Sequence, residues 1–129
     1  MKVLTANGEH RIMKIAVYGT LKSGYWNHWY ISRSRLVGTG WTKDKYGLYV
    51  QGIPYVVKEE EVSQVSVEVY EVDEATLRNV DRLEGHPHGY RREPVDIELD
   101  NGEDILAELY FFPNAPSRAE VESSGVYRG

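Results

Sequence analysis

The chain has 129 residues, of which 41% are hydrophobic and 27% are charged, and these values are typical of one globular domain with a single core. The net charge of −5 argues against nucleic acid or an anionic membrane as the main partner, because phosphate binding usually needs a basic surface. The absence of cysteine excludes disulfides, thiol catalysis and thiolate metal sites, and the lack of a membrane-length apolar run or signal-peptide core favours a cytoplasmic protein.

Residues 1–12 are polar and weakly patterned, and we expect an N-terminal extension or mobile arm there. A β-like run over residues 14–18 then leads directly into Gly19. Because glycine tolerates positive φ and a close approach of ligand to the chain, the segment that follows can present consecutive backbone N–H groups. Such a nest binds a carboxylate, a phosphate or a developing oxyanion. We call residues 19–21 the glycine loop.

An aromatic-rich segment, residues 24–30, is predicted to form a loop followed by a short helical turn. Tryptophan and tyrosine carry a large apolar surface with one polar tip, so these side chains suit the wall of a small-molecule pocket. They would equally suit a cap over the core, and the sequence leaves both interpretations open. His28 has no partner four residues later and no second histidine nearby, so we do not expect it to bind a metal.

Short strands are predicted over residues 36–41, 46–50 and 53–57, with glycines where a sheet could bend or a barrel could close. Alternating apolar residues predict two half-buried strands, over residues 65–70 and 90–99. Asn101 and Gly102 then predict a tight hairpin with a return strand over residues 104–112. The domain is expected to span residues 13–113, followed by a polar C-terminal tail, residues 114–129, without a predicted element.

One helix is predicted, between Asp73 and Gly85. Asp73 is a good N-cap residue, and Gly85 can end the helix as its left-handed C-terminal residue. Val72 and Leu77 have the spacing of a hydrophobic staple around the N-cap.

Glu84 falls on the apolar face of this helix, together with Leu77 and Val80. Partial burial would disfavour the charged carboxylate and raise its pKa, as a general base near neutral pH requires. The alternative is a glutamate at the helix end that turns outward or pairs with Arg91 or Arg92, and spacing alone does not separate the two. We predict that the N–H groups of the glycine loop are unpaired and face a cavity that also contains Glu84.

Two sets of residues resemble the signatures of the gamma-glutamylcyclotransferase-like family, and most resemble its gamma-glutamylamine cyclotransferase branch. The first set is residues 17–22 with Gly24, Asn27 and His28, and the second is Val72, Asp73, Leu77, residues 81–85 and residues 90–92. The similarity covers roughly residues 13–113 and implies an α+β fold, a small mixed β-barrel with one or two helices.

The resemblance also implies the roles of individual residues. Glu84 takes the part of the family's catalytic acid/base, and the substrate's glutamyl group is held by Tyr18, Gly19, Thr20, Leu21 and Tyr90. The implied reaction, of transferase or lyase type, converts a gamma-glutamyl amine or gamma-glutamyl amino acid to 5-oxoproline (pyroglutamate) and the free amine. It needs no cofactor and no metal. The leaving amine and the oligomeric state are not specified by these motifs.

Two other classes of function remain open at this point. A catalytically silent module of the same fold could bind a glutamyl metabolite without turnover. A phosphate or nucleic-acid binder built on the glycine loop is disfavoured, because the loop matches neither G-x-G-x-x-G nor the P-loop pattern and the net charge is negative.

Overall fold

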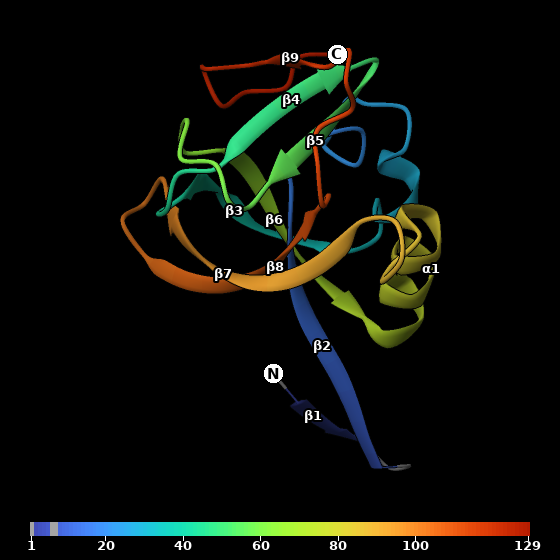
Figure 1. Cartoon of the computed structure of the whole chain (residues 1–129). Helices are drawn as coiled ribbons and strands as arrows, with labels where there is room; N and C mark the ends of the chain where they lie inside the picture. The colour runs from blue at the N-terminus through green and yellow to red at the C-terminus, as the bar shows by residue number, and fades with distance from the viewer. Residues whose placement is uncertain (1, 6–7) are drawn as a thin grey trace.

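The computed structural model describes residues 2–5 and 8–129, and it describes side chains from Ile12 onward. Figure 1 shows the arrangement of its elements. In chain order they are β1 (Lys2–Thr5), β2 (Gly8–Val17), the 3-10 turn η1 (His28–Tyr30), β3 (Arg35–Thr42), β4 (Gly47–Gln51), β5 (Ile53–Val57), β6 (Ser66–Asp73), α1 (Glu74–Glu84), β7 (Arg91–Leu99), β8 (Asp104–Phe111) and β9 (Glu120–Val121).

A closed ring of strands forms the centre of the fold. The strands β2, β6, β3, β7 and β8 are hydrogen-bonded in that order, and β8 returns to β2. Neighbouring strands are antiparallel except for β2 and β8, which run parallel where Ile15 faces Glu108. This one parallel contact closes the sheet, so the predicted small mixed β-barrel is confirmed. The second sheet, β5-β4-β9, crosses one end of the barrel (Figure 1).

The predicted strands are confirmed from β3 to β8, with ends that differ by at most three residues. Of the predicted N-terminal arm, residues 1, 6 and 7 lie outside the described residues. β1 pairs antiparallel with the first part of β2, and β2 begins at Gly8 instead of near residue 14. In the tail, β9 pairs with β4 through Tyr49 and Val121, an element that the sequence does not predict.

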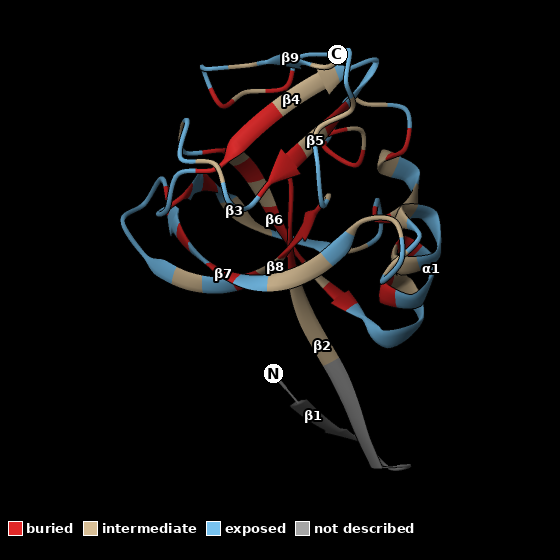
Figure 2. Ribbon diagram, viewed as in Figure 1, coloured by how far each residue is buried: buried red, intermediate tan, exposed pale blue. Residues whose placement is uncertain are grey.

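Both faces of β2 are buried over residues 15–17, and this makes the end of the strand the wall between two apolar clusters. Ala16 and Tyr18 point into the barrel, where they join the buried side chains of β6, β7 and β8. Ile15 and Val17 point the other way and pack under α1 with Leu77. Figure 2 shows the buried residues gathered along the inside of the barrel and beneath the helix. The strand therefore brings its C-terminal end, and the glycine loop after it, beside the helix.

The predicted helix is confirmed together with its two ends. The side chain of Asp73 accepts a hydrogen bond from the N–H of Thr76 at 2.8 Å, and Gly85 has the left-handed conformation with φ +72°. Leu77 and Val80 are buried against the barrel. None of the helical residues that the structure describes belongs to a segment long and apolar enough to span a bilayer.

The predicted hairpin between β7 and β8 is also confirmed. The N–H of Gly102 bonds to the carbonyl of Leu99 at 2.9 Å, and the N–H of Leu99 bonds to the carbonyl of Glu103 at 2.8 Å. Gly102 has φ +91°, whereas Asn101 does not have a positive φ. The connection is therefore a four-residue turn that ends in a glycine bulge.

Candidate active site

One cavity of about 230 Å³ lies where the end of β2, the start of β5 and the last turn of α1 meet. Its size suits a small molecule. It is lined by Ala16, Val17, Tyr18, Gly19, Thr20, Leu21, Trp26, Asn27, Ile53, Pro54, Leu83, Glu84, Tyr90 and Tyr110. All six residues that the sequence singles out for the site, Tyr18, Gly19, Thr20, Leu21, Glu84 and Tyr90, therefore surround the same space.

The glycine loop turns sharply after β2. The carbonyl of Gly19 accepts a hydrogen bond from the N–H of Lys22 at 3.0 Å, while Thr20 is bound twice by Asn27, through its carbonyl and through its hydroxyl, each at 3.0 Å. Among the described residues, none accepts a hydrogen bond from the N–H of Gly19, Thr20 or Leu21. The loop is thus held from outside through its oxygen atoms, and its three N–H groups stay available to a ligand.

Only glycine fits at position 19, because the backbone there packs directly against the ring of Pro54. A Cβ atom at this position would lie 2.5 Å from Cγ of Pro54, closer than real Cβ contacts come. Pro54 sits in β5 and lines the cavity beside the loop. The tight packing of Gly19 on Pro54 therefore fixes the distance between two walls of the cavity.

Glu84 is the last residue of α1, and its side chain lines the cavity. Although Glu84 keeps some contact with solvent there, burial raises its pKa to about 7, and the negative charge of Asp81 adds to the increase. Within the described residues Glu84 forms no ion pair, because Arg91 lies beside Glu93 and Arg92 binds Asp81 and Glu108. The alternative in which Glu84 pairs with Arg91 or Arg92 is therefore wrong.

Three tyrosines, Tyr18, Tyr90 and Tyr110, line the cavity with this carboxyl group, and each donates its hydroxyl hydrogen to an acceptor, which for Tyr110 is Asp81. Tyr18 donates to the carbonyl of Tyr110 at 2.7 Å, and Tyr90 donates to the carbonyl of Pro54 at 2.8 Å. Burial raises the pKa of both Tyr18 and Tyr90, and the charge of Glu84 contributes to both increases. These phenols therefore stay neutral at physiological pH. The Tyr90 hydroxyl oxygen retains a lone pair that can accept a hydrogen bond, whereas the Tyr18 hydroxyl is also bonded to the backbone of Val56.

Different residues of the aromatic segment, residues 24–30, contact the cavity and the core. Trp26 and Asn27 line the cavity, whereas Tyr30 packs against the cluster under α1. His28 lies in η1, with Nδ1 2.8 Å from the carbonyl of Leu21. Sequence reasoning assigned no role to Asn27, although this residue belongs to the first signature and its contacts with Thr20 hold the loop.

Chemically, the arrangement combines an anion-binding backbone loop with one carboxyl group that can gain or lose a proton near neutral pH. The backbone donors can hold a carboxylate or a carbonyl oxygen, and a carboxyl group with a pKa near 7 can act in both directions of a proton transfer. A small barrel with this arrangement is suited to acid/base chemistry on a small molecule. The comparison with known proteins is more specific.

The family model described as gamma-glutamyl cyclotransferase, AIG2-like, matches residues 15–129. The chain therefore belongs to the gamma-glutamyl cyclotransferase family, and it is an enzyme of the cyclotransferase type. The match includes residues 114–129, which the sequence analysis placed outside the domain.

Similar proteins carry related names. A Methanocaldococcus jannaschii protein with the provisional name gamma-glutamylcyclotransferase is 53% identical over 115 residues, which are 88% of this chain and 94% of that protein. The gamma-glutamylaminecyclotransferase of Bos taurus is 33% identical over 105 residues, covering 74% of this chain and 62% of that protein. The crystal structure of a mouse AIG2-like protein aligns with a TM-score of 0.79 at 27% identity, over 92% of this chain and 90% of that one.

Proposed function

We propose that this protein converts a gamma-glutamyl amine or gamma-glutamyl amino acid to 5-oxoproline and the free amine, with Glu84 as general acid and base. The proposal rests on the environment of Glu84. Its carboxyl group has no ion-pair partner among the described residues and a pKa of about 7, and it shares one cavity with the free N–H groups of residues 19–21.

The substrate brings its own nucleophile. The neutral α-amine attacks the γ-carbonyl carbon, and a five-membered ring forms as the new C–N bond is made. Glu84 takes the proton that the amine nitrogen loses and delivers a proton to the departing nitrogen, whose bond to the γ-carbon then breaks. The proton removed at one nitrogen is thus returned at the other, and the carboxylate is regenerated. Since the reaction is intramolecular, holding the glutamyl chain in a bent conformation supplies much of the acceleration.

The glycine loop provides that hold. Its N–H groups are suited to bind the glutamyl group through oxygen atoms and to stabilise negative charge that develops on the γ-carbonyl oxygen. Tyr90 donates its own hydroxyl proton to a carbonyl, so its oxygen can accept a hydrogen bond from the substrate's α-ammonium or amine. Tyr18 lines the same cavity. The remaining walls, near Trp26 and Pro54, offer apolar contacts to the substrate.

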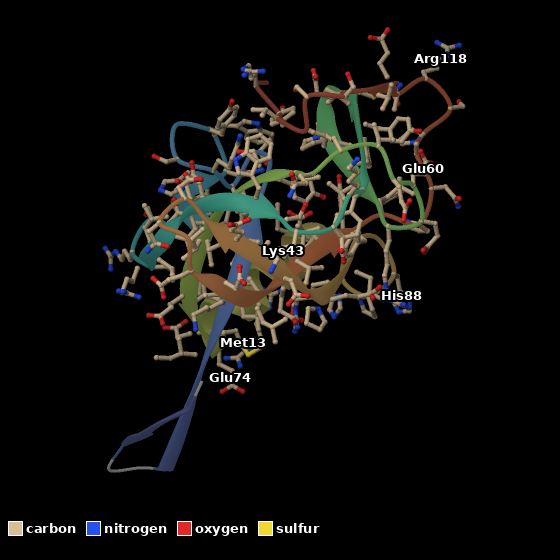
Figure 3. All side chains as sticks on the ribbon, turned by 90° about the vertical axis from the view of Figure 1, so that its left-hand side faces the viewer. Met13, Lys43, Glu60, Glu74, His88 and Arg118 are labelled. Atoms are coloured by element: carbon tan, nitrogen blue, oxygen red, sulfur yellow. The ribbon has the colours of Figure 1, made fainter. Side chains whose placement is uncertain are left out.

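The test is the substitution Glu84→Gln, measured with a panel of gamma-glutamyl amides and amino acids as substrates. Glutamine keeps the size of the side chain but cannot accept the amine proton, and general acid/base groups contribute ~10²–10⁴-fold to the rate. We expect a loss of this size in 5-oxoproline release per folded molecule. Glu74→Gln is the matched control, because Glu74 is an exposed carboxylate at the start of the same helix (Figure 3).

The same measurements distinguish a cyclotransferase from a module that binds a glutamyl metabolite without turnover. If the wild-type protein releases no 5-oxoproline from any of these substrates but binds one of them, the protein is a silent glutamyl-binding module. If Glu84→Gln retains the wild-type rate, Glu84 is not the base. Equal losses in Glu84→Gln and Glu74→Gln would point to a general effect of charge instead of proton transfer.

A further inference from the structure

Tyr127 lies close to the end of the sequence, in a segment without secondary structure, yet it is only 4% exposed. Its backbone carbonyl accepts a hydrogen bond from Nζ of Lys22 at 2.8 Å and a longer one from the hydroxyl of Tyr25 at 3.3 Å. The rings of Tyr25 and Tyr127 are also in contact, with centroids 5.6 Å apart. The C-terminal segment is therefore attached to the residues that directly follow the glycine loop.

Lys22 is an unusual residue for such a contact, because it is a buried cation with 8% exposure. Burial lowers the pKa of Lys22, against the attraction of Glu68. The ammonium group is compensated by the Tyr127 carbonyl and by the ring of Tyr25, whose centroid lies 5.2 Å from Nζ. Burying an ammonium group is costly without such partners, so this contact holds the chain at Lys22 in one place.

The side chain of Tyr127 reaches the opposite wall of the cavity. Its hydroxyl donates to the carbonyl of Gly52 at 3.0 Å, in the turn between β4 and β5. The next two residues, Ile53 and Pro54, both line the cavity. Pro54 in turn lies directly against Gly19. Tyr127 thus contacts the segment that follows Gly19 and the segment that precedes Pro54, and it does not line the cavity itself.

We propose that Tyr127 is a positioning residue of the active site, which holds the glycine loop and the Pro54 wall at the separation that binds the glutamyl group. This inference rests on the proposed function, since it assigns the substrate's glutamyl group to the cavity. The Tyr127 carbonyl fixes the loop through Lys22, and the Tyr127 hydroxyl fixes the wall through Gly52. Glu84 lies on α1, which neither contact reaches.

This geometry predicts which kinetic constants change when the Tyr127 contacts are lost. The loop holds the substrate before the reaction and stabilises the developing charge during it, so a displaced loop weakens both states. A change of this kind raises KM and can also lower kcat, but it leaves the pH at half-maximal rate unchanged, since that pH follows Glu84 on α1. A purely structural role of the tail would lower the thermal stability and leave the KM of the folded molecules at the wild-type value.

The experiment compares Tyr127→Phe, which removes only the hydroxyl group, with Lys22→Met, which removes the ammonium group. Ser124→Ala is the control, because its hydrogen bonds lie entirely within the tail, to Glu122 and Val126. For Tyr127→Phe and Lys22→Met we expect KM for a gamma-glutamyl amide to rise about three- to tenfold, as for the loss of one hydrogen bond. The pH at half-maximal rate remains that of the wild type, and Ser124→Ala changes neither this pH nor KM.

Two further measurements do not depend on turnover. In amide NMR spectra, Tyr127→Phe shifts the resonances of Gly19, Thr20 and Leu21, and Ser124→Ala leaves them in place. Calorimetry with 5-oxoproline as the probe gives weaker binding for Tyr127→Phe than for the wild type. Unchanged loop resonances and an unchanged KM in both variants would overturn the positioning role.

The outcomes distinguish this inference from the proposed function. If the wild type releases 5-oxoproline and the KM of Tyr127→Phe is normal, the positioning role is wrong and the function stands. If the wild type releases none but binds 5-oxoproline, more weakly in Tyr127→Phe, the positioning role stands and the function is wrong. If the wild type neither turns over the substrates nor binds the probe, both are wrong.

Discussion

Asp81 and Glu84 lie about one turn apart on α1, yet among the side chains that the structure describes only Asp81 has a cationic partner. Arg92 donates to Asp81 from Nε at 2.8 Å and from Nη2 at 3.1 Å, and the hydroxyl of Tyr110 donates to it at 2.6 Å. Burial alone would raise the pKa of Asp81, but these hydrogen bonds outweigh it and lower the pKa. The fixed charge of Asp81 then raises the pKa of Glu84 further. The pair therefore divides into a structural carboxylate and a carboxyl group that titrates near neutral pH.

The first prediction concerns the pH dependence of catalysis. A base must be ionised to accept a proton, so kcat/KM of the wild type should fall as the pH drops through about 7. Asp81→Asn removes the neighbouring negative charge and should move this midpoint to lower pH. The measurement is kcat/KM against pH for both proteins with one gamma-glutamyl amide.

Glu108→Gln is the matched control for Asp81→Asn. Both substitutions remove a partner of Arg92, and Nη1 of Arg92 binds Glu108 at 2.8 Å. Both should therefore lower the melting temperature, but Glu108→Gln should leave the pH midpoint at the wild-type value. An unchanged midpoint in Asp81→Asn would show that burial alone sets the pKa of Glu84.

The second prediction concerns stability. The folded-state pKa of Glu84, about 7, lies above its ordinary value of 4.5, so the folded protein favours the protonated form. The resulting loss of stability is absent below about pH 4.5, grows up to about pH 7 and stays constant above it. Glu84→Gln removes this loss and should stabilise the protein at pH ~8 by at most ~3 kcal/mol. Thermal melts of both proteins at low and high pH provide the measurement, and a lower melting temperature of the variant at high pH would contradict it.

Local patterns in the sequence were sufficient for most of the barrel and for the helix. Val95, Ile97 and Leu99 alternate with acidic residues, and this period of two assigned the buried face of β7 correctly. The glycine loop and Glu84 were each recognisable from their neighbours in the chain. Their meeting in one cavity was predicted from the transition of a strand into glycine, but local pattern alone does not establish it, because it depends on the pairing of distant strands.

The parts that the sequence did not predict depend on distant contacts. Tyr127 lies between Val126 and Arg128 without a periodic pattern around it, and its partners Lys22 and Gly52 are 105 and 75 positions away in the chain. β9 has only two residues, and it exists because β4 offers it a free edge. No local periodicity can reveal either feature, because the stabilising partners are brought together only by the closed fold.

A third prediction tests the hairpin at Gly102. A Cβ at this position would meet nothing within 4 Å, so Gly102→Ala is unfavourable only through the backbone, whose φ is +91°. We expect a loss of ~1 kcal/mol in unfolding free energy, because residues with a Cβ rarely adopt this conformation. Gly102→Asn should lose less, since asparagine tolerates positive φ better. Chemical denaturation measures the loss, and a large decrease in kcat per folded molecule would show that the hairpin contributes to the active site.

The last prediction tests the contact between Gly19 and Pro54. In Gly19→Ala the new methyl group would lie 2.5 Å from Cγ of Pro54, so the loop must move away from the wall of the cavity. We expect 5-oxoproline release to fall by an order of magnitude or more, because small misplacements of binding groups are costly in rate.

The double variant Gly19→Ala with Pro54→Ala separates the contact from other effects of the methyl group. Alanine lacks the Cγ and Cδ atoms of proline and keeps only Cβ, which lies 3.9 Å from the new methyl position, an ordinary contact distance. The carbonyl of residue 54 also remains available to the hydroxyl of Tyr90. If the contact with the ring causes the loss, the double variant should be more active than Gly19→Ala, and kcat/KM of the four proteins in the cycle measures this coupling. Purely additive losses would instead mean that the methyl group occupies space that the substrate needs.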